Sequence, residues 1–511
     1  MVKGLPHIPW VWAWGAVALA FPWSNAFMSM ATGLLGFTAL LHIFGNRSAY
    51  SAGRPMVRNC GWGLILLVAW SGMSWFWGGD IDACLHDVRV KLPLAIGGMA
   101  MIAMSRENEP IPESGVDALL RLAVASAASA TIAVVVLDIF DGGEMGGRQA
   151  SRFISHIRFG LWWALLLPWV THRLGANWQW LALGGALLAW TWLQGVTGMA
   201  VGCALAPWWW PSAQLGRRAP DKKAWPSRAT IRRAGIRFGA VGMVLLMGLV
   251  SSLPTAPPTA ESLPMASASG EKYIHKLDRC VTENGHHVWT MIAWSELNAA
   301  WQQRSDVPIE NIQGALIRFL ASKGLSKDTE GVAQLSVDEV RAIETGIPSV
   351  VELEGTSWAR RWNRFAYNWG EWWDGRRSPD ASILSRSVYL EVGVAALGDF
   401  SIKDAVLGSG IGGLIPLLES NYEEHVPDWP KEGRKRPHNQ FLTLLLSLGV
   451  VGLAIWCWAL VSTWPCHPSR PAVLLLALSC LAEDTLETQA GVTLTIVALA
   501  WGLLIPFEGR E

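Results

Sequence analysis

A single histidine stands where a long apolar stretch of the chain begins, in the sequence Arg436-Pro437-His438-Asn439. Histidine exchanges a proton near neutral pH, and the positive end of a helix favours the neutral, basic imidazole. We therefore expect His438 to be a candidate for proton transfer. A polar cap at a membrane interface is the competing interpretation of the same residues.

Three arginines, Arg148, Arg152 and Arg158, lie close together ahead of another apolar segment. A guanidinium presents a planar fork that suits phosphate oxygens, and a pyrophosphate would need more than one. The segment is thus a candidate phosphate site. Salt bridges to nearby acidic residues would explain the same arginines without a ligand; the candidates are Asp138, Asp141 and Glu144.

A fourth arginine, Arg386, precedes an apolar helical segment, and a glycine-rich stretch around Gly410 follows it. Backbone N–H groups freed by glycines could approach an anion, so Gly410 is a candidate binding residue. A flexible turn is the alternative explanation for the glycines.

The acidic pair Asp80 and Asp82 could bind Mg²⁺ or Mn²⁺, since these cations prefer carboxylates. Asp-x-Asp is nevertheless common by chance, and we predict no metal and no other cofactor. The seven cysteines include no Cys-x-x-Cys pair, and only Cys84 and Cys280 are placed so that a disulfide is conceivable. The chain has no Walker loop, dinucleotide fingerprint or Gly-x-Ser-x-Gly elbow.

Composition indicates which elements must position these residues. Hydrophobic residues make up 51% of the 511 residues and charged ones 16%, below the usual quarter in soluble proteins. The 32 tryptophans against 5 tyrosines suit a membrane interface. Lysine plus arginine and aspartate plus glutamate both number 41, which gives no indication of a nucleic-acid partner. We therefore predict an all-α polytopic membrane protein that contacts membrane lipid.

Segments long enough to cross a bilayer number about twelve. We place them near 8–23, 26–44, 61–78, 92–104, 116–138, 158–172, 178–193, 195–211, 236–253, 438–462, 471–483 and 490–506. The predicted organisation is transmembrane helices 1–9 in residues 1–253, a large helical domain in 254–437, and helices 10–12 in 438–511.

Orientation follows from the excess of lysine and arginine in cytoplasmic loops. The segment from Arg217 to Arg237 is strongly basic, and Arg47, Arg54 and Arg58 form a second basic loop. Both follow an even number of spans, so the N- and C-termini are predicted to be cytoplasmic and residues 254–437 to lie outside. An aromatic stripe from Trp358 to Trp373 in this outer domain fits a helix on the membrane surface or a platform for sugars.

His438 and Asn439, followed by Gly449 and Gly452, resemble the signature of the O-antigen ligase family, whose fold O-antigen polymerases share. Other segments agree in order. They are Val90 to Leu94, Phe153 to Phe159 with its arginine, Arg386 to Gly413, and Ala482 to Gln489. The resemblance runs from about Leu92 to Leu504, although Gln194 to Gly198 stand where many relatives carry a Ser-Arg pair.

The resemblance implies a membrane glycosyltransferase of lipopolysaccharide biosynthesis in the bacterial inner membrane, with its active site facing the periplasm. It would move O-antigen glycan, with inversion and without metal, from undecaprenyl pyrophosphate to lipid A–core or another glycan acceptor. His438 would be the general base, and Asn439 would orient the imidazole or the acceptor. Arg158 and Arg386 would hold the diphosphate, with Arg148 and Arg152 as second choices. The alternatives are an O-antigen polymerase and, in a different class, a polysaccharide flippase without chemistry.

Overall fold

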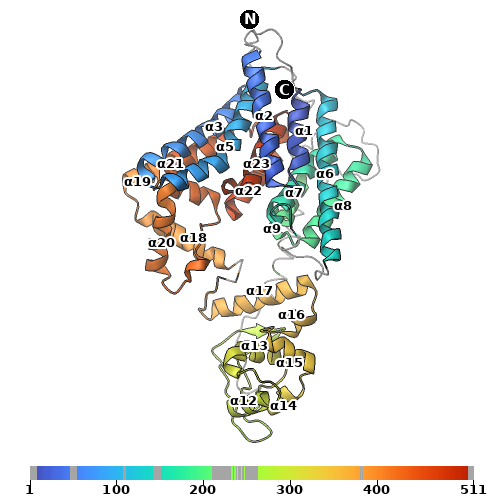
Figure 1. Cartoon of the computed structure of the whole chain (residues 1–511), viewed down its shortest axis with the longest axis vertical. Helices are drawn as coiled ribbons and strands as arrows, with labels where there is room; N and C mark the ends of the chain where they lie inside the picture. The colour runs from blue at the N-terminus through green and yellow to red at the C-terminus, as the bar shows by residue number, and fades with distance from the viewer. Residues whose placement is uncertain are drawn as a thin grey trace. The chain divides into compact units, whose positions relative to one another are not determined.

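The computed structural model describes residues 9–45, 54–107, 111–141, 151–209, 263–379, 381 and 384–504, and single positions between 232 and 247. These residues are mostly helical, in agreement with the predicted all-α class, with one two-stranded sheet among them. The chain divides into two compact units. We call Met1–Val241 together with Tyr389–Glu511 the bundle, and Gly242–Val388 the insert (Figure 1).

The bundle is built from helices on both sides of the insert in the sequence. Before it come α1 (Trp10–Ala20), α2 (Asn25–Gly45), α3 (Pro55–Met73), α4 (Trp75–Gly78), α5 (Ile81–Met104), α6 (Glu113–Phe140), α7 (His156–Arg173), α8 (Ala176–Trp192), α9 (Val196–Ala204) and α10 (Ala206–Trp209). After it come α18 (Ser385–Gly398), α19 (Ile402–Leu407), α20 (Ile411–His425), η3 (Lys431–Gly433), α21 (Gln440–Val461), η4 (His467–Ser469), α22 (Arg470–Ala482), η5 (Thr485–Glu487) and α23 (Gln489–Leu504). The boundary between the units crosses α18.

The insert has a hydrophobic core of its own, which includes Leu297, Trp301, Leu316 and Phe319. Its elements are β1 (Thr282–Glu283), β2 (His286–His287), α12 (Trp294–Gln302), α13 (Ile309–Ser322), α14 (Thr329–Ala333), α15 (Val337–Glu344), α16 (Val350–Glu354) and α17 (Ser357–Trp373). The helical spacing of its apolar residues in the sequence therefore corresponds to buried helix faces, as periodicity predicts.

Four described helices are long and apolar enough to cross a membrane: Asn25–Phe44, Pro55–Gly78, Glu113–Phe140 and Gln440–Val461. They coincide with four of the predicted spans. Trp10–Ala20 and Gln489–Leu503 are shorter apolar helices. Large apolar side chains are exposed on α2 and α6, such as Phe37 at 53% and Ile132 at 57%, and lipid would cover such surfaces. Most residues of the predicted span 236–253 and of the basic segment from Arg217 to Arg237 lie outside the described residues.

The observed units divide the chain differently from the predicted domains. We predicted one outer domain over 254–437, but residues 389–437 belong to the bundle. The reason is packing: Trp77 Nε1 donates to Leu407 O at 3.2 Å, and Ile411 N donates to the Ser74 hydroxyl at 3.2 Å. These polar contacts attach α19 and α20 to the junction of α3 and α4.

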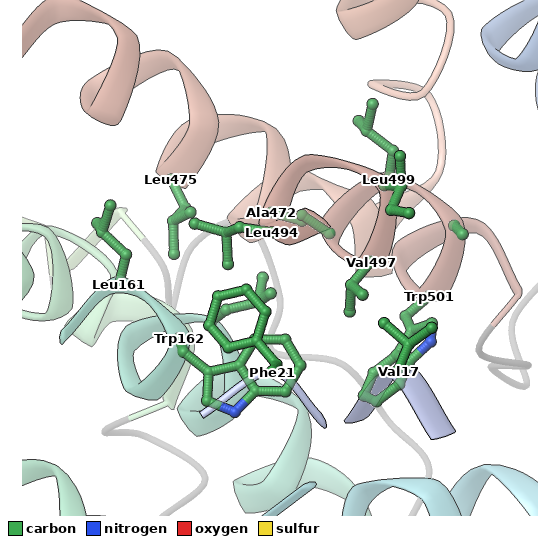
Figure 2. Packing of buried hydrophobic residues seen from close by; sticks show 14 of the residues in the cluster. Val17, Phe21, Leu161, Trp162, Ala472, Leu475, Leu494, Val497, Leu499 and Trp501 are labelled. Atoms are coloured by element: carbon green, nitrogen blue, oxygen red, sulfur yellow. The ribbon is translucent and has the colours of Figure 1, made fainter. Parts of the chain in front are cut away.

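Close helix contacts in the bundle depend on small residues. A Cβ on Gly98 of α5 would lie 2.5 Å from Gly61 O of α3, so these two backbones meet directly. Where there is more room, aromatic rings fill the core. Phe21 stacks on Trp162 with ring centroids 4.2 Å apart, and Trp501 packs nearby (Figure 2).

Helix α21 contains a kink at Gly449, which has a φ of +67°. A Cβ there would lie 2.1 Å from Val406 O, so a glycine is needed for the approach of α19. Two backbone carbonyls of α21 just before the kink accept hydrogen bonds from neighbouring elements. Ser409 N donates to Leu446 O at 2.8 Å, and Trp70 Nε1 donates to Leu448 O at 3.0 Å.

The contact between α3 and α5 can be tested by Gly98→Ala. The added methyl group must displace the Gly61 backbone, and we expect a loss of about 1–3 kcal/mol in the free energy of unfolding. The midpoint of thermal unfolding in detergent measures this loss. Gly33→Ala on α2 is the matched control, since nothing lies within 4 Å of its added Cβ. An unchanged midpoint for Gly98→Ala, equal to that of the control, would contradict the packing.

Candidate active site

The bundle contains a cavity of about 660 Å³ in which side chains from distant parts of the sequence meet. The size is within the range of small-molecule sites. Its walls are the start of α5, the start of α7, the segment before α21 and the turn between α22 and α23. The lining residues are Asp80, Asp82, Ala83, His86, Asp87, Val90, Arg158, Arg436, His438, Glu483, Asp484, Glu487 and Thr488.

His438 lies in this wall in a conformation that is rare for a residue other than glycine, with φ of +51°. Pro437 before it packs against Gly393, where an added Cβ would lie 2.8 Å from Pro437 Cγ. Asn439 after it caps α21, because its side-chain oxygen accepts from Leu442 N at 3.1 Å. The Tyr389 ring lies against the imidazole, with centroids 5.5 Å apart. His438 is therefore held on a tightly constrained turn, as is common at functional sites.

Arg158 enters the cavity from the first turn of α7 and is buried, at 4% exposure. Its guanidinium donates to the Ser479 hydroxyl at 3.3 Å and to Asp484 O at 3.2 Å. The Ser479 hydroxyl in turn lies 2.7 Å from that of Thr485. Arg158 is thus positioned by a side-chain hydroxyl of α22 and by a backbone carbonyl of the turn between α22 and α23.

A buried ion network forms the floor of the site. Glu487 accepts from Lys91 Nζ at 2.9 Å and also pairs with Arg436, while Lys91 pairs with Asp87 one turn earlier on α5. Gln440 Nε2 adds a bond to Glu487 at 3.2 Å. Burial alone would raise the pKa of Glu487, but the charges of Lys91 and Arg436 outweigh it and hold that pKa well below its usual range.

Two further carboxylates complete the turn between α22 and α23. Glu483 is 6% exposed, and its Oε2 atom lies 3.5 Å from His438 Nδ1. Asp484 accepts a hydrogen bond from the Thr443 hydroxyl at 2.7 Å. Burial raises the pKa of Asp484, whereas this hydrogen bond acts in the opposite direction. Glu483 and Asp484 thus add two carboxyl groups to the wall of the cavity, and Glu483 is the one in ion-pair range of the imidazole.

Of the three predicted catalytic residues, the structure brings two into the cavity, His438 and Arg158. Arg386 is the second residue of α18 and belongs to the insert, so its part in the site stays a prediction. Arg152 pairs with Asp141, which is one of the salt bridges considered as the alternative for that segment. Arg148 and Glu144 lie outside the described residues.

The predicted binding residues Asn439 and Gly410 both have structural roles. Asn439 is the N-cap of α21. Gly410 has φ of +77°, and a Cβ there would lie 2.4 Å from the Cα of Gly78, so packing of α20 on α4 explains this glycine. Ser409 N and Ile411 N on either side are already bonded to protein oxygens. Ligand binding by these two residues stays a prediction.

The predicted alternative metal residues, Asp80 and Asp82, lie at the exposed end of the cavity. Asp80 is the N-cap of α5, since its Oδ1 accepts from Asp82 N at 2.9 Å and Ala83 N at 3.1 Å. Within the described ranges, no group of three histidine, cysteine or acidic residues is arranged to hold a metal ion. Cys84 and Cys280 are both free thiols.

Sequence reasoning assigned no role to five residues that shape the site: Lys91, Arg436, Glu483, Asp484 and Glu487. A signal was present, because ionisable groups at the ends of apolar segments are costly and are rarely there without function. The sequence does not show which of these charged residues pair with one another. Lys91 and Glu487 are 396 positions apart in the chain yet in contact in the fold.

Comparison with known proteins does not place the chain in a family. No protein-family model matches it, and no curated protein sequence matches it.

The ion network can be tested by Glu487→Gln. The substitution leaves the buried Lys91 and the partly exposed Arg436 without their shared carboxylate, and removal of one partner of a buried ion pair costs about 3–5 kcal/mol. We expect a clear fall in the thermal midpoint of the purified protein in detergent. Asp338→Asn is the matched control, because Asp338 pairs with Arg341 on the surface. The side chain of Asp338 is 87% exposed and that of Arg341 is 72% exposed. Equal midpoints for the two variants would contradict a supporting role for Glu487.

Proposed function

We propose that the chain is a glycosyltransferase of the O-antigen ligase type, which transfers a glycan from a polyprenyl pyrophosphate donor to an acceptor hydroxyl. The observation that carries the proposal is the meeting of His438, Arg158 and Arg436 in one cavity of the bundle. A proton acceptor and two phosphate-binding side chains are the groups this reaction needs. The resemblance of the sequence segments around His438 and Arg158 supports the same chemistry.

In the proposed reaction the acceptor oxygen attacks the anomeric carbon of the donor. His438 accepts the proton of the attacking hydroxyl, a role typically worth about 10²–10⁴-fold in rate. The bond from the anomeric carbon to the phosphate oxygen breaks, and its electron pair leaves with the pyrophosphate. Arg158 and Arg386 would stabilise the negative charge that builds up on the leaving group. Direct attack inverts the configuration at the anomeric carbon.

Arg436 is a further candidate for the phosphate site. It lines the cavity with a side chain that is 31% exposed, although it also pairs with Glu487. Six carboxyl groups line the same cavity. Asp87 and Glu487 pair with Lys91, Asp484 accepts from Thr443, and Glu483 lies 3.5 Å from His438. The two others, Asp80 and Asp82, lie at the exposed end, so the deep part of the cavity is less acidic than the whole lining.

The proposal includes a location. We propose about twelve spans in a bacterial inner membrane, with the cavity on the periplasmic side and both termini in the cytoplasm. Lipid A–core is the proposed acceptor. An O-antigen polymerase, which transfers to another lipid-linked glycan, needs the same base and the same phosphate-binding groups.

The chemistry is tested with purified protein and a lipid-linked glycan donor. We expect His438→Ala to reduce transfer at least about 10²-fold, the low end of a general-base contribution. Arg158→Lys and Arg386→Lys should rescue poorly, because a point charge lacks the planar fork. Normal accumulation of each variant in the membrane is the control for folding.

Activity in the same assay should survive EDTA. EDTA could instead abolish the activity, and Mg²⁺ or Mn²⁺ could restore it. That result would mean that a metal ion bound by Asp80 and Asp82 holds the phosphates. Wild-type activity of His438→Ala would exclude the general base.

The choice of acceptor is tested in a deletion strain. Loss of a ligase should leave long glycan chains on the polyprenyl carrier and bare core on the lipopolysaccharide, and we expect this pattern. Lipopolysaccharide capped by a single repeat unit would identify a polymerase, since ligation of short donors would continue. Single lipid-linked units held on the cytoplasmic side would identify a flippase and contradict the enzyme proposal.

A further inference from the structure

Within the cavity, the imidazole of His438 has one ring nitrogen that the described contacts leave unsatisfied. Nδ1 is buried and makes no hydrogen bond, although Glu483 Oε2 lies 3.5 Å away. Buried polar atoms of folded proteins are nearly always hydrogen-bonded, so an exception calls for a reason. A distance of 3.5 Å is long for a hydrogen bond, but catalytic hydrogen bonds are often long without substrate and shorten when it binds.

The backbone on each side of this contact is held by different elements. His438 is constrained by the capped start of α21, by Pro437 against Gly393 and by the Tyr389 ring. Glu483 follows the last turn of α22 in an extended conformation, and its N–H donates to Ser479 O at 2.8 Å. A shift of either side chain by a few tenths of an ångström would bring the two atoms to hydrogen-bond distance, about 3 Å.

Other charged groups around the cavity already have partners of their own. Asp484 accepts from Thr443, Arg436 pairs with Glu487, and Asp87 pairs with Lys91. Arg158 donates to Ser479 and Asp484, while Asp80, Asp82 and His86 lie at the exposed end of α5. Of the carboxylates in the described parts of the chain, Glu483 is therefore the one in ion-pair contact with His438.

We propose that Glu483 is the positioning residue of the base: its carboxylate accepts the hydrogen of His438 Nδ1 and so leaves Nε2 as the proton acceptor. This inference rests on the proposed transfer reaction and adds a residue to it. The carboxylate keeps the imidazole in one tautomer and one orientation. When Nε2 takes the proton of the acceptor hydroxyl, the negative charge of Glu483 stabilises the imidazolium that forms, and Glu483 itself keeps no proton.

Glu483→Gln removes the charge and keeps the size of the side chain. In the triad of serine proteases, the equivalent change of the orienting carboxylate lowers kcat by about 10⁴-fold. For the longer contact here we expect kcat to fall by about tenfold or more, with KM for the donor unchanged. The proposed contact stabilises the protonated imidazole, so its removal should also change the dependence of kcat/KM on pH. We expect the decline of kcat/KM on the acidic side of the profile, its acidic limb, to move to lower pH.

Two further variants separate positioning from a structural role. Glu483→Asp keeps the charge, so we expect partial activity and an acidic limb near that of the wild type. Glu424→Gln, an exposed glutamate on α20, is the matched control and should change neither kcat nor the limb. If Glu483→Gln does not fold, Glu483→Asp and Glu483→Ala are compared in the same assay, and the limb should move only in Glu483→Ala.

Two outcomes overturn the inference and differ from failure of the proposed function. If His438→Ala is inactive but Glu483→Gln has wild-type kcat and an unmoved acidic limb, Glu483 does not position the base. A fall in kcat with an unmoved limb, equal in Glu483→Gln and Glu483→Asp, would assign Glu483 a structural role only. If His438→Ala keeps wild-type activity, the proposed base itself is wrong, whatever Glu483 does.

Discussion

Glu487 pairs with Lys91 and Arg436 at once, and this buried junction connects three elements that are far apart in the sequence. Lys91 comes from the middle of α5, Arg436 from the segment before α21, and Glu487 from η5. A buried charge without a partner is costly, so the carboxylate of Glu487 stabilises the buried ammonium of Lys91 while it also pairs with the partly exposed Arg436. The junction thereby sets where His438 and Asp484, each within three positions of a member of the network, stand in the cavity wall.

The same junction depends on how closely the helices approach. Gly61 and Gly98 let α3 and α5 meet backbone to backbone, and a Cβ on Gly97 of α5 would lie 2.6 Å from Ile496 of α23. With α5 held at this distance from α23, the side chain of Lys91 reaches η5. The ionic contacts therefore depend on the small residues that let these helices approach. The shape of the cavity depends in turn on the ionic contacts.

The chemistry that the cavity could support follows from the contrast between its side chains. Arg158 donates to the Ser479 hydroxyl and to the Asp484 carbonyl, and these two bonds fix the orientation of its guanidinium. Arg436 shares Glu487 with Lys91, and His438 lies beside Glu483. A basic imidazole and positive charges within one low-dielectric space are suited to a proton transfer coupled to departure of an anion.

The sequence by itself determined the local features of this protein. Long apolar segments indicated membrane helices, and four of them are helices long and apolar enough to span a bilayer. The position of His438 and Asn439 before an apolar stretch predicted the start of a helix, and α21 begins there. The helical spacing of apolar residues such as Leu316 and Phe319 indicates the face of α13 that is buried. These features depend on residues within a few turns of one another, so periodicity and capping are sufficient to find them.

Only the tertiary structure decided which distant residues meet. Arg152 and Arg158 look alike in sequence, yet the first pairs with Asp141 and the second enters the cavity. Gly410 could have served an anion or a turn, and its contact with Gly78 explains it by packing. Glu483 lies 45 positions from His438, and nothing in the pattern of either segment specifies the other. Such contacts depend on how whole helices pack, and every side chain of the interface contributes to that packing. A local sequence pattern does not contain this information.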